Sequence, residues 1–158
     1  MFVVECNPDF VLVSSLISIS KKKIEHASGK ARVIRKLMRN FENSIGMVDE
    51  DPHSTTPSAL KKFREIEFLD RYKIKILYHS QRRNRLVVLC PKLEEWIVEA
   101  GKEANVNLNN YNLPSDPIEL HKIINIRTKE FHKLIEDLSK TSPRIKALHA
   151  CLKPSNSH

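Results

Sequence analysis

Four acidic residues lie where two apolar, strand-like runs end. Glu5 closes FVVE (residues 2–5), Asp49 and Asp51 lie near the end of SIGMVDEDP (residues 44–52), and Asp9 follows Glu5 by four residues. Acidic residues are disfavoured in strands, so Glu5 in particular needs a chemical reason. Carboxylates held close together repel, and a hard divalent cation that takes carboxylate and phosphate oxygens relieves the repulsion. If they converge, these acids predict a Mg²⁺ or Mn²⁺ site, although Asp9 alone is also an ordinary residue for a helix start.

Alternating strand and helix patterns explain how acids so far apart in the sequence could meet. Strands are expected at 2–5, 23–27 and 44–52, each followed by a helical spacing of apolar residues, at 9–19, 30–41 and 58–72. Such alternation is typical of a parallel sheet covered by helices. In a doubly wound sheet of order 2-1-3, the first and third strands are neighbours, and ligands bind beyond their carboxyl ends. The acids are therefore expected at one edge of the sheet.

The second half of the chain predicts a hairpin and then helices. Strands at 73–79 and 85–90 flank a short loop, and Pro91 opens a helix over 92–104. Asp116, followed by Pro117 and then Glu119, predicts the start of a helix that runs to about residue 138. A last helix is expected over 143–152. The predicted fold is α/β, a doubly wound, mostly parallel sheet with helices on both faces. Residues 1–104 form the α/β domain, and 105–158 form a helical extension packed on it.

Charge and cysteine content limit the class of protein. The chain has 27 basic and 19 acidic residues, a net charge of +8, which favours nucleic acid as a partner. Its three cysteines form no pair of metal-ligand or disulfide spacing, as expected in a reducing cytoplasm. No apolar run is long enough to cross a membrane, so no membrane partner is expected. Three glycines in total exclude a glycine-rich nucleotide-binding loop.

Other charged residues have both a structural and a functional interpretation. Glu94 and Glu95 begin the helix after the fifth strand, where they either complement the helix dipole or supply a second metal site. Lys30 begins an earlier helix, and Arg82 and Arg83 lie in the hairpin loop. Each of these three side chains either faces solvent or contacts phosphate. The same two alternatives hold for Arg85 and for Lys21, Lys22 and Lys23.

The acidic pattern resembles the Toprim domain, which carries a Glu at the end of its first strand and Asp-x-Asp at the end of its third. The corresponding stretches here are VVEC and GMVDEDP. The interval from Glu5 to Asp9 resembles the OLD-like nuclease branch, and HASGK (26–30) and CPKLEEWI (90–97) resemble later stretches of such domains. The resemblance covers roughly residues 1–100. Cys6 stands where the family usually has glycine.

The resemblance implies Mg²⁺- or Mn²⁺-dependent hydrolysis of nucleic-acid phosphodiesters by a small nuclease. Glu5, Asp49 and Asp51 would be catalytic metal ligands, and Asp9 a further ligand. It also implies a possible ATPase partner in a defence system. One alternative is an inactive interaction or nucleic-acid-binding module, which Cys6 favours. A receiver-like phosphoacceptor is a third possibility, but it expects the acidic pair after the first strand, whereas this chain has it after the third.

Overall fold

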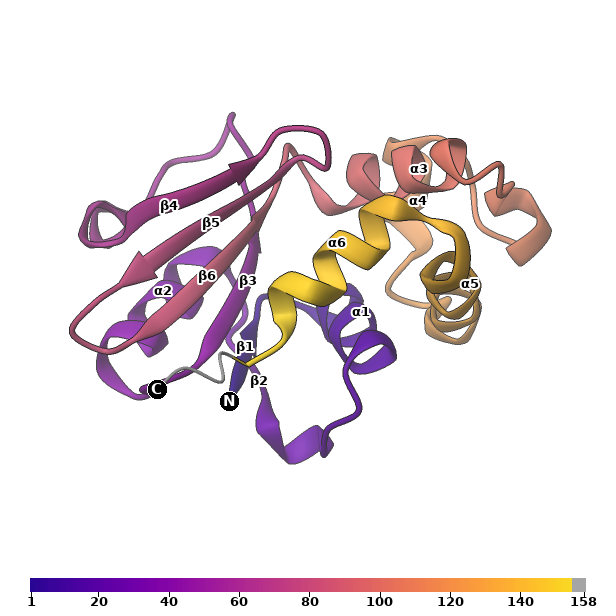
Figure 1. Cartoon of the computed structure of the whole chain (residues 1–158). Helices are drawn as coiled ribbons and strands as arrows, with labels where there is room; N and C mark the ends of the chain where they lie inside the picture. Colours follow the sequence, from indigo (N-terminus) through magenta and orange to yellow (C-terminus); the bar gives the residue numbers. More distant parts are fainter. Residues whose placement is uncertain (155–158) are drawn as a thin grey trace.

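The computed structural model describes residues 1–154. Six strands form one sheet in the order β2-β1-β3-β6-β5-β4 (Figure 1). The strands β2, β1, β3 and β6 pair in parallel, whereas β5 and β4 are antiparallel to their neighbours. This is the expected α/β fold with a mostly parallel sheet. The strands are β1 (Phe2–Val4), β2 (Ile24–His26), β3 (Ile45–Asp49), β4 (Arg64–Leu69), β5 (Ile74–His79) and β6 (Asn84–Leu89).

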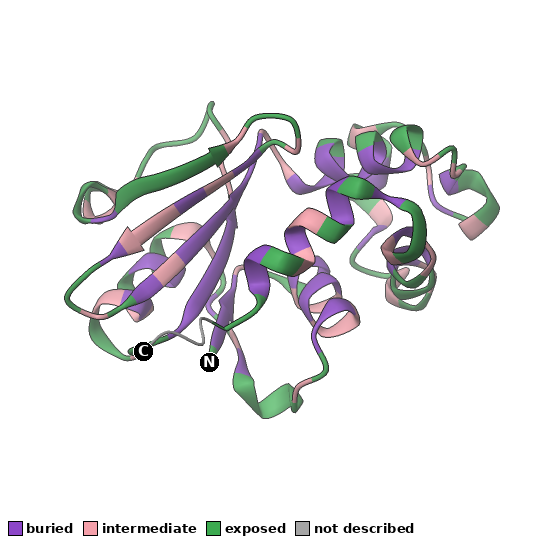
Figure 2. Cartoon of the chain, in the orientation of Figure 1, coloured by how far each residue is buried: buried purple, intermediate pink, exposed green. Residues whose placement is uncertain are grey.

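Helices cover both faces of the sheet because its central strands are apolar on both sides. Val3 and Val48 pack with α2 in one hydrophobic cluster, and Val4 and Met47 pack in a second, larger cluster. The central strands are buried and β4 is exposed (Figure 2). The helices are α1 (Asn7–Leu16), α2 (Lys30–Arg39), α3 (Leu93–Glu103), α4 (Pro117–Ile123), α5 (Thr128–Thr141) and α6 (Pro143–Leu152), with short 3₁₀ turns η1 (Lys21–Lys23), η2 (Ser58–Lys62) and η3 (Leu108–Tyr111).

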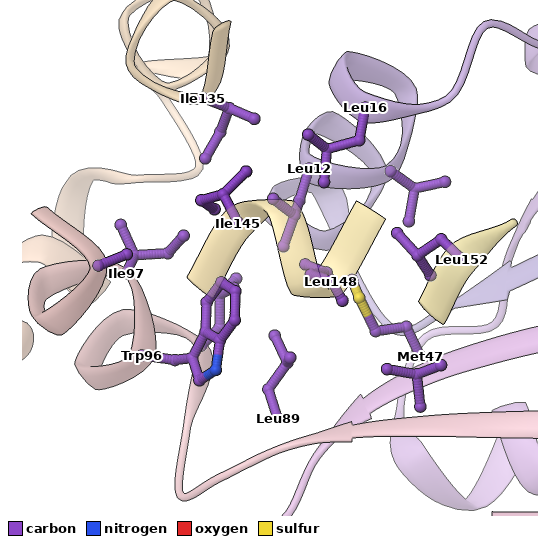
Figure 3. Packing of buried hydrophobic residues seen from close by; sticks show 14 of the residues in the cluster. Leu12, Leu16, Met47, Leu89, Trp96, Ile97, Ile135, Ile145, Leu148 and Leu152 are labelled. Carbon is purple, nitrogen blue, oxygen red and sulfur yellow. The ribbon is translucent and has the colours of Figure 1, made fainter. Parts of the chain in front are cut away.

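The larger cluster joins the sheet to the helices that follow it. Leu12 of α1, Met47 of β3, Trp96 of α3 and Leu148 of α6 all belong to this cluster, which Figure 3 shows from close by. The helices after residue 104 thus share a hydrophobic core with the sheet. The last four residues of the predicted extension, 155–158, lie outside the described residues. Within the part that is described, no helix combines the length and the apolar character needed to cross a membrane.

The strand order confirms the predicted 2-1-3 arrangement. Phe2 pairs with Ile24 on one side and with Ile45 on the other, and Val4 pairs with Met47. Because β1 and β3 run in the same direction, the residues that follow them lie at one edge of the sheet, which we call the carboxyl edge. The opposite edge, where β1, β3 and β6 begin, is the amino edge.

The predicted helix over 58–72 is wrong. Its first part is the 3₁₀ turn η2, and the rest is the edge strand β4, which pairs with β5. Apolar residues three apart matched a helical face, but Ile66 is 49% exposed, so no buried helical face exists. Pairing with β5 through a tight turn supplies the backbone hydrogen bonds that decide the structure, and local spacing does not report this pairing.

The predicted long helix from Pro117 to about residue 138 is two helices, α4 and α5. The start is confirmed, since the Asp116 side chain accepts a hydrogen bond from the Glu119 amide at 3.0 Å. The break after Ile123 lets α4 lie along α3 while α5 lies along α1. One straight helix could not bury both apolar stretches against these two partners. The apolar residues at helical spacing in this segment are buried: Leu120, Ile124, Phe131, Leu134, Ile135 and Leu138.

A buried asparagine holds α2 against the amino edge. Asn84 accepts a hydrogen bond from the Ser44 amide at 2.8 Å and donates to the carbonyls of Phe41 and Leu37. Replacing Asn84 with alanine leaves these buried backbone groups without partners, and we expect the free energy of unfolding to fall by about 3 kcal/mol. Urea unfolding measures this, and a loss below about 1 kcal/mol would contradict the described network.

Candidate metal centre

A pocket of about 620 Å³ opens at the carboxyl edge, between the sheet, the start of α3 and helix α4. The lining brings together all six acids that the sequence singled out: Glu5, Asp9, Asp49, Asp51, Glu94 and Glu95. Glu5 follows β1, Asp49 ends β3, and Asp9 lies in the first turn of α1. The parallel register of β1 and β3 explains why residues more than forty positions apart meet here.

Glu5 is held against the end of β3. Its Oε1 accepts a hydrogen bond from the Asp49 amide at 3.1 Å. Burial raises the pKa of Glu5 above its ordinary value, and that hydrogen bond and nearby Lys30 partly offset the rise. The second carboxylate oxygen is left free of this bond. Glu5 is therefore both a structural link between β1 and β3 and an oxygen donor at the pocket.

Asp9 does not cap the helix that it begins. The N-cap of α1 is Cys6, which makes no side-chain capping bond. Asp9 is 2% exposed, its Oδ2 accepts a hydrogen bond from the Cys6 thiol at 3.3 Å, and its Oδ1 has no partner. Burial raises the pKa of Asp9 well above its usual range, and the charges of Asp49 and Glu5 raise it further. Asp9 thus lies in the first turn of α1, as a helix-start residue would, but without a capping bond, and its burial needs another explanation.

Asp49, like Asp9, has a carboxyl group with a raised pKa and one buried, unpaired oxygen. Burial raises the pKa of Asp49 to about 7, with contributions from the charges of Glu5, Glu94 and Asp51, against a backbone hydrogen bond from Leu93. Its Oδ1 is buried and has no hydrogen-bond partner. Buried polar atoms in native proteins are almost always paired, so two orphaned oxygens in one pocket are informative.

The two orphaned atoms are carboxylate oxygens, which suit Mg²⁺ or Mn²⁺. Within residues 1–154, no three Asp, Glu, His or Cys side chains are gathered closely enough to form a complete metal site as they stand. The acids are nevertheless close enough to interact electrostatically. The pKa of each of Glu5, Asp9 and Asp49 is raised by the charge of at least one other acid of the pocket. A hard cation at this pocket would therefore require these side chains to turn toward it.

Asp51 lies at the rim of the pocket. Its backbone adopts a left-handed conformation, with φ of 44°, which Asp tolerates better than most residues. Its Oδ1 is 3.7 Å from the Lys92 ammonium. The intervening Glu50 faces away from the pocket, since its side chain pairs with Lys75 at 2.7 Å. Lys30 donates to the Glu50 carbonyl at 2.6 Å, which places its charge beside the acids.

Glu94 and Glu95 differ although they are adjacent. Glu94 is 8% exposed, and its Oε1 lies 2.9 Å from His121 Nδ1 on α4. Glu95 is exposed and lines both this pocket and the neighbouring one. Both lie in the first turn of α3, as the helix-dipole interpretation expects. A second metal site at Glu94 would compete with His121.

The sequence did not assign Lys92, His121 or Lys122 to the site, although all three line the pocket. His121 and Lys122 reach it only because α4 packs beside α3. Nothing in the local pattern of α4 signals this, because the contact of His121 joins it to a residue 27 positions earlier. The helical extension thus completes the wall of the pocket.

The structure does not bring Arg82 and Arg83 to this pocket. They lie in the turn before β6, whereas Leu89 at the other end of β6 pairs with Asp49. One strand of this length separates the two ends by roughly 20 Å. Phosphate held by these arginines would therefore not be the phosphate at the acidic pocket.

Comparison of the chain with protein-family models, with curated proteins and with solved structures gives no significant match. The resemblance to the Toprim domain therefore rests on the motifs of the sequence and stays a prediction.

Cys6 offers a direct test of how the thiol affects the pocket. Its φ of −153° is ordinary extended backbone, so the conformation does not require the glycine of the Toprim pattern. Replacing Cys6 with glycine removes the thiol from Asp9 Oδ2 and keeps a residue that is tolerated at an N-cap. We expect Mn²⁺ to bind about tenfold more tightly, because Asp9 no longer has to give up the thiol hydrogen bond to bind the ion, and isothermal titration calorimetry measures the change. Unchanged or weaker binding would show that the thiol does not restrict Asp9.

Proposed function

We propose that the acidic pocket binds Mg²⁺ or Mn²⁺ and hydrolyses nucleic-acid phosphodiesters. The observation that carries the proposal is the pair of buried carboxylate oxygens, Asp9 Oδ1 and Asp49 Oδ1, which have no hydrogen-bond donor. Unpaired carboxylates in a buried site are costly, and a divalent cation offsets that cost. Their position beyond the carboxyl ends of neighbouring parallel strands supports a ligand site.

The proposed roles follow from where each side chain lies. Glu5, Asp9 and Asp49 supply oxygens to the ion from the floor of the pocket, and Asp51 supplies one from the rim. A metal held by these residues would supply activation of water and neutralisation of the phosphate charge. Lys30, whose ammonium is anchored on the Glu50 carbonyl, and Lys122 on α4 contribute positive charge for the substrate backbone. An ATPase partner follows only from the resemblance and stays a prediction.

A second candidate function is a catalytically inactive binding module with the same fold. It is favoured by the protein's own contacts to the acids: the Cys6 thiol on Asp9, Lys92 near Asp51, and His121 on Glu94. These contacts partly neutralise the pocket without an ion. In this case the acids stabilise an interaction surface and cleave nothing.

A nuclease assay with a matched variant distinguishes the two candidates. Fluorescent DNA and RNA are incubated with the protein and Mn²⁺, and the Asp49→Asn variant is compared with Asp70→Asn. Asp70 is an exposed acid paired with Lys73 that does not line the pocket, so it serves as a control for the loss of one charge. We expect Asp49→Asn to lower the rate at least about 100-fold and Asp70→Asn to leave it unchanged.

Two results would contradict the proposed nuclease. Cleavage by Asp49→Asn at the wild-type rate would place the chemistry elsewhere or in a contaminant. Metal binding by the wild type without cleavage of either nucleic acid would favour the inactive module.

A further inference from the structure

Three side chains form a row across the amino edge of the sheet, at the opposite end from the acidic pocket. Arg64 of β4 pairs with Tyr78 of β5, and Tyr78 pairs in turn with Arg85 of β6. Residues that pair directly across neighbouring strands project to the same face of a sheet. The row therefore places a tyrosine side chain between two guanidinium groups, an arrangement that an anion could bridge.

This row lines a pocket of about 620 Å³, which we call the arginine pocket. Arg83 enters it from the β5–β6 turn, and the exposed Ile66 lies beside it. Among the described residues, the lining includes neither Asp nor Glu. Within residues 1–154, three arginines thus share one hollow that no acidic side chain lines.

The hydrogen bonds of these arginines leave their charge available. Arg85 donates to the carbonyl oxygens of Cys151, at 2.6 Å, and Lys153, at 3.2 Å, so its guanidinium is oriented by neutral groups. For Arg64 and Arg83, residues 1–154 provide no side-chain hydrogen bond or ion pair. By contrast, Lys75 and Lys92 at the carboxyl edge are each close to an acid.

More positive charge lies along the same edge of the sheet as the arginine pocket. Lys21, Lys22 and Lys23 form an exposed turn directly before β2, and β2 begins at the amino edge because Ile24 pairs with Phe2. Part of the net positive charge of the chain is therefore concentrated at the amino edge. A broad region of this kind exceeds what a single phosphate group would neutralise.

We infer that the arginine pocket binds the phosphodiester backbone of a single-stranded nucleic acid. Guanidinium groups match phosphate oxygens with paired hydrogen bonds, and the Tyr78 ring offers a surface on which a base can stack. A flexible single strand can follow a hollow and continue over the lysine turn, which a rigid duplex does less easily. The inference goes beyond the proposed nuclease and does not depend on a metal ion.

Binding is measured by fluorescence anisotropy with a labelled DNA single strand of about 20 nucleotides, in EDTA so that no cleavage or metal site contributes. The test variant combines Arg64→Gln with Arg83→Asn, because Arg83 has a left-handed backbone, with φ of 57°, which asparagine tolerates. The control combines Lys129→Gln with Lys140→Gln, two exposed lysines of α5, and removes the same charge. Circular dichroism confirms that both variants are folded.

We expect the arginine variant to bind about tenfold or more weakly at about 50 mM salt, while the lysine control changes affinity less than about twofold. The slope of log affinity against log salt should fall by about 1.4 in the arginine variant, since each lost contact with a single strand removes about 0.7. Equal weakening in the control would overturn the inference, as would absence of binding by the wild type. Full competition by inorganic phosphate at low millimolar concentration would also overturn it, because the pocket would then recognise one phosphate group and no strand.

Discussion

The metal-free Asp49→Asn protein is expected to be more stable than the wild type at pH 8. Burial raises the pKa of Asp49 from 3.8 to about 7 in the folded protein, so the ionised side chain opposes folding. Between about pH 4 and pH 7 the unfolded chain loses this proton while the folded protein keeps it, and stability falls as pH rises. Above about pH 7 the loss is nearly complete, on the order of 4 kcal/mol, and asparagine avoids it.

Metal should reverse this order. Mn²⁺ is expected to raise the melting temperature of the wild type at pH 8 and to leave that of Asp49→Asn nearly unchanged, because a ligand that binds only the folded state stabilises it. Thermal unfolding at pH 5 and pH 8, with EDTA or Mn²⁺, measures both effects, with Asp70→Asn as the control. A variant less stable than the wild type at pH 8 without metal would show that the Asp49 carboxylate is satisfied by the protein itself.

Replacing Trp96 with alanine is expected to lower the free energy of unfolding by about 4 kcal/mol. The ring is fully buried in the cluster that joins the sheet to the later helices, and its Nε1 donates to the Tyr72 carbonyl at 2.8 Å. This bond ties the β4–β5 turn to α3, the helix that carries Glu94. Trp96 is the only tryptophan, so the variant has no tryptophan fluorescence, and its unfolding in urea is followed by circular dichroism.

A Trp96→Phe variant separates the two contributions of this side chain. Phenylalanine keeps most of the apolar contact but leaves the Tyr72 carbonyl without its donor, and we expect a loss of about 2 kcal/mol. A loss below about 1 kcal/mol in the alanine variant would contradict the central place of Trp96 in the core.

The part of the site that strand order determines could be predicted from the sequence. Glu5 and Asp49 end two apolar runs of a repeating strand–helix pattern, and parallel strands that are neighbours must bring such residues to one edge. Asp9 follows Glu5 so closely that it could not lie elsewhere. Both the alternation of strands and helices and the strand order that it implies can be inferred from the sequence.

Contacts that depend on how helices pack could not be predicted in this way. The break between α4 and α5 occurs where the chain changes partner, and it brings His121 to Glu94. The helix predicted over 58–72 was wrong for a related reason. The pairing of β4 with β5 outweighs the helical spacing of its apolar residues. The distance between Arg83 and the acids also needed the register of β6, since the sequence placed Arg83 only in the loop between two strands.

The two edges of the sheet differ in charge, so the protein is electrostatically asymmetric from one edge to the other. Acids gather at the carboxyl edge, around Asp9 and Asp49, and arginines without acid partners among the described residues gather at the amino edge, around Arg64 and Arg83. A polyanion is attracted to the second edge and repelled from the first unless a cation is bound there. Metal binding would therefore be expected to change where along the molecule nucleic acid makes contact.

Anomalous diffraction from a crystal soaked in Mn²⁺ tests the proposed metal centre most directly. The proposal predicts one strong anomalous peak in the pocket at the carboxyl edge, within bonding distance of Asp49 and of Glu5 or Asp9, and no such peak in crystals of Asp49→Asn. A clear map without any peak at these carboxylates, or a peak elsewhere alone, would contradict the metal site and the nuclease proposed from it.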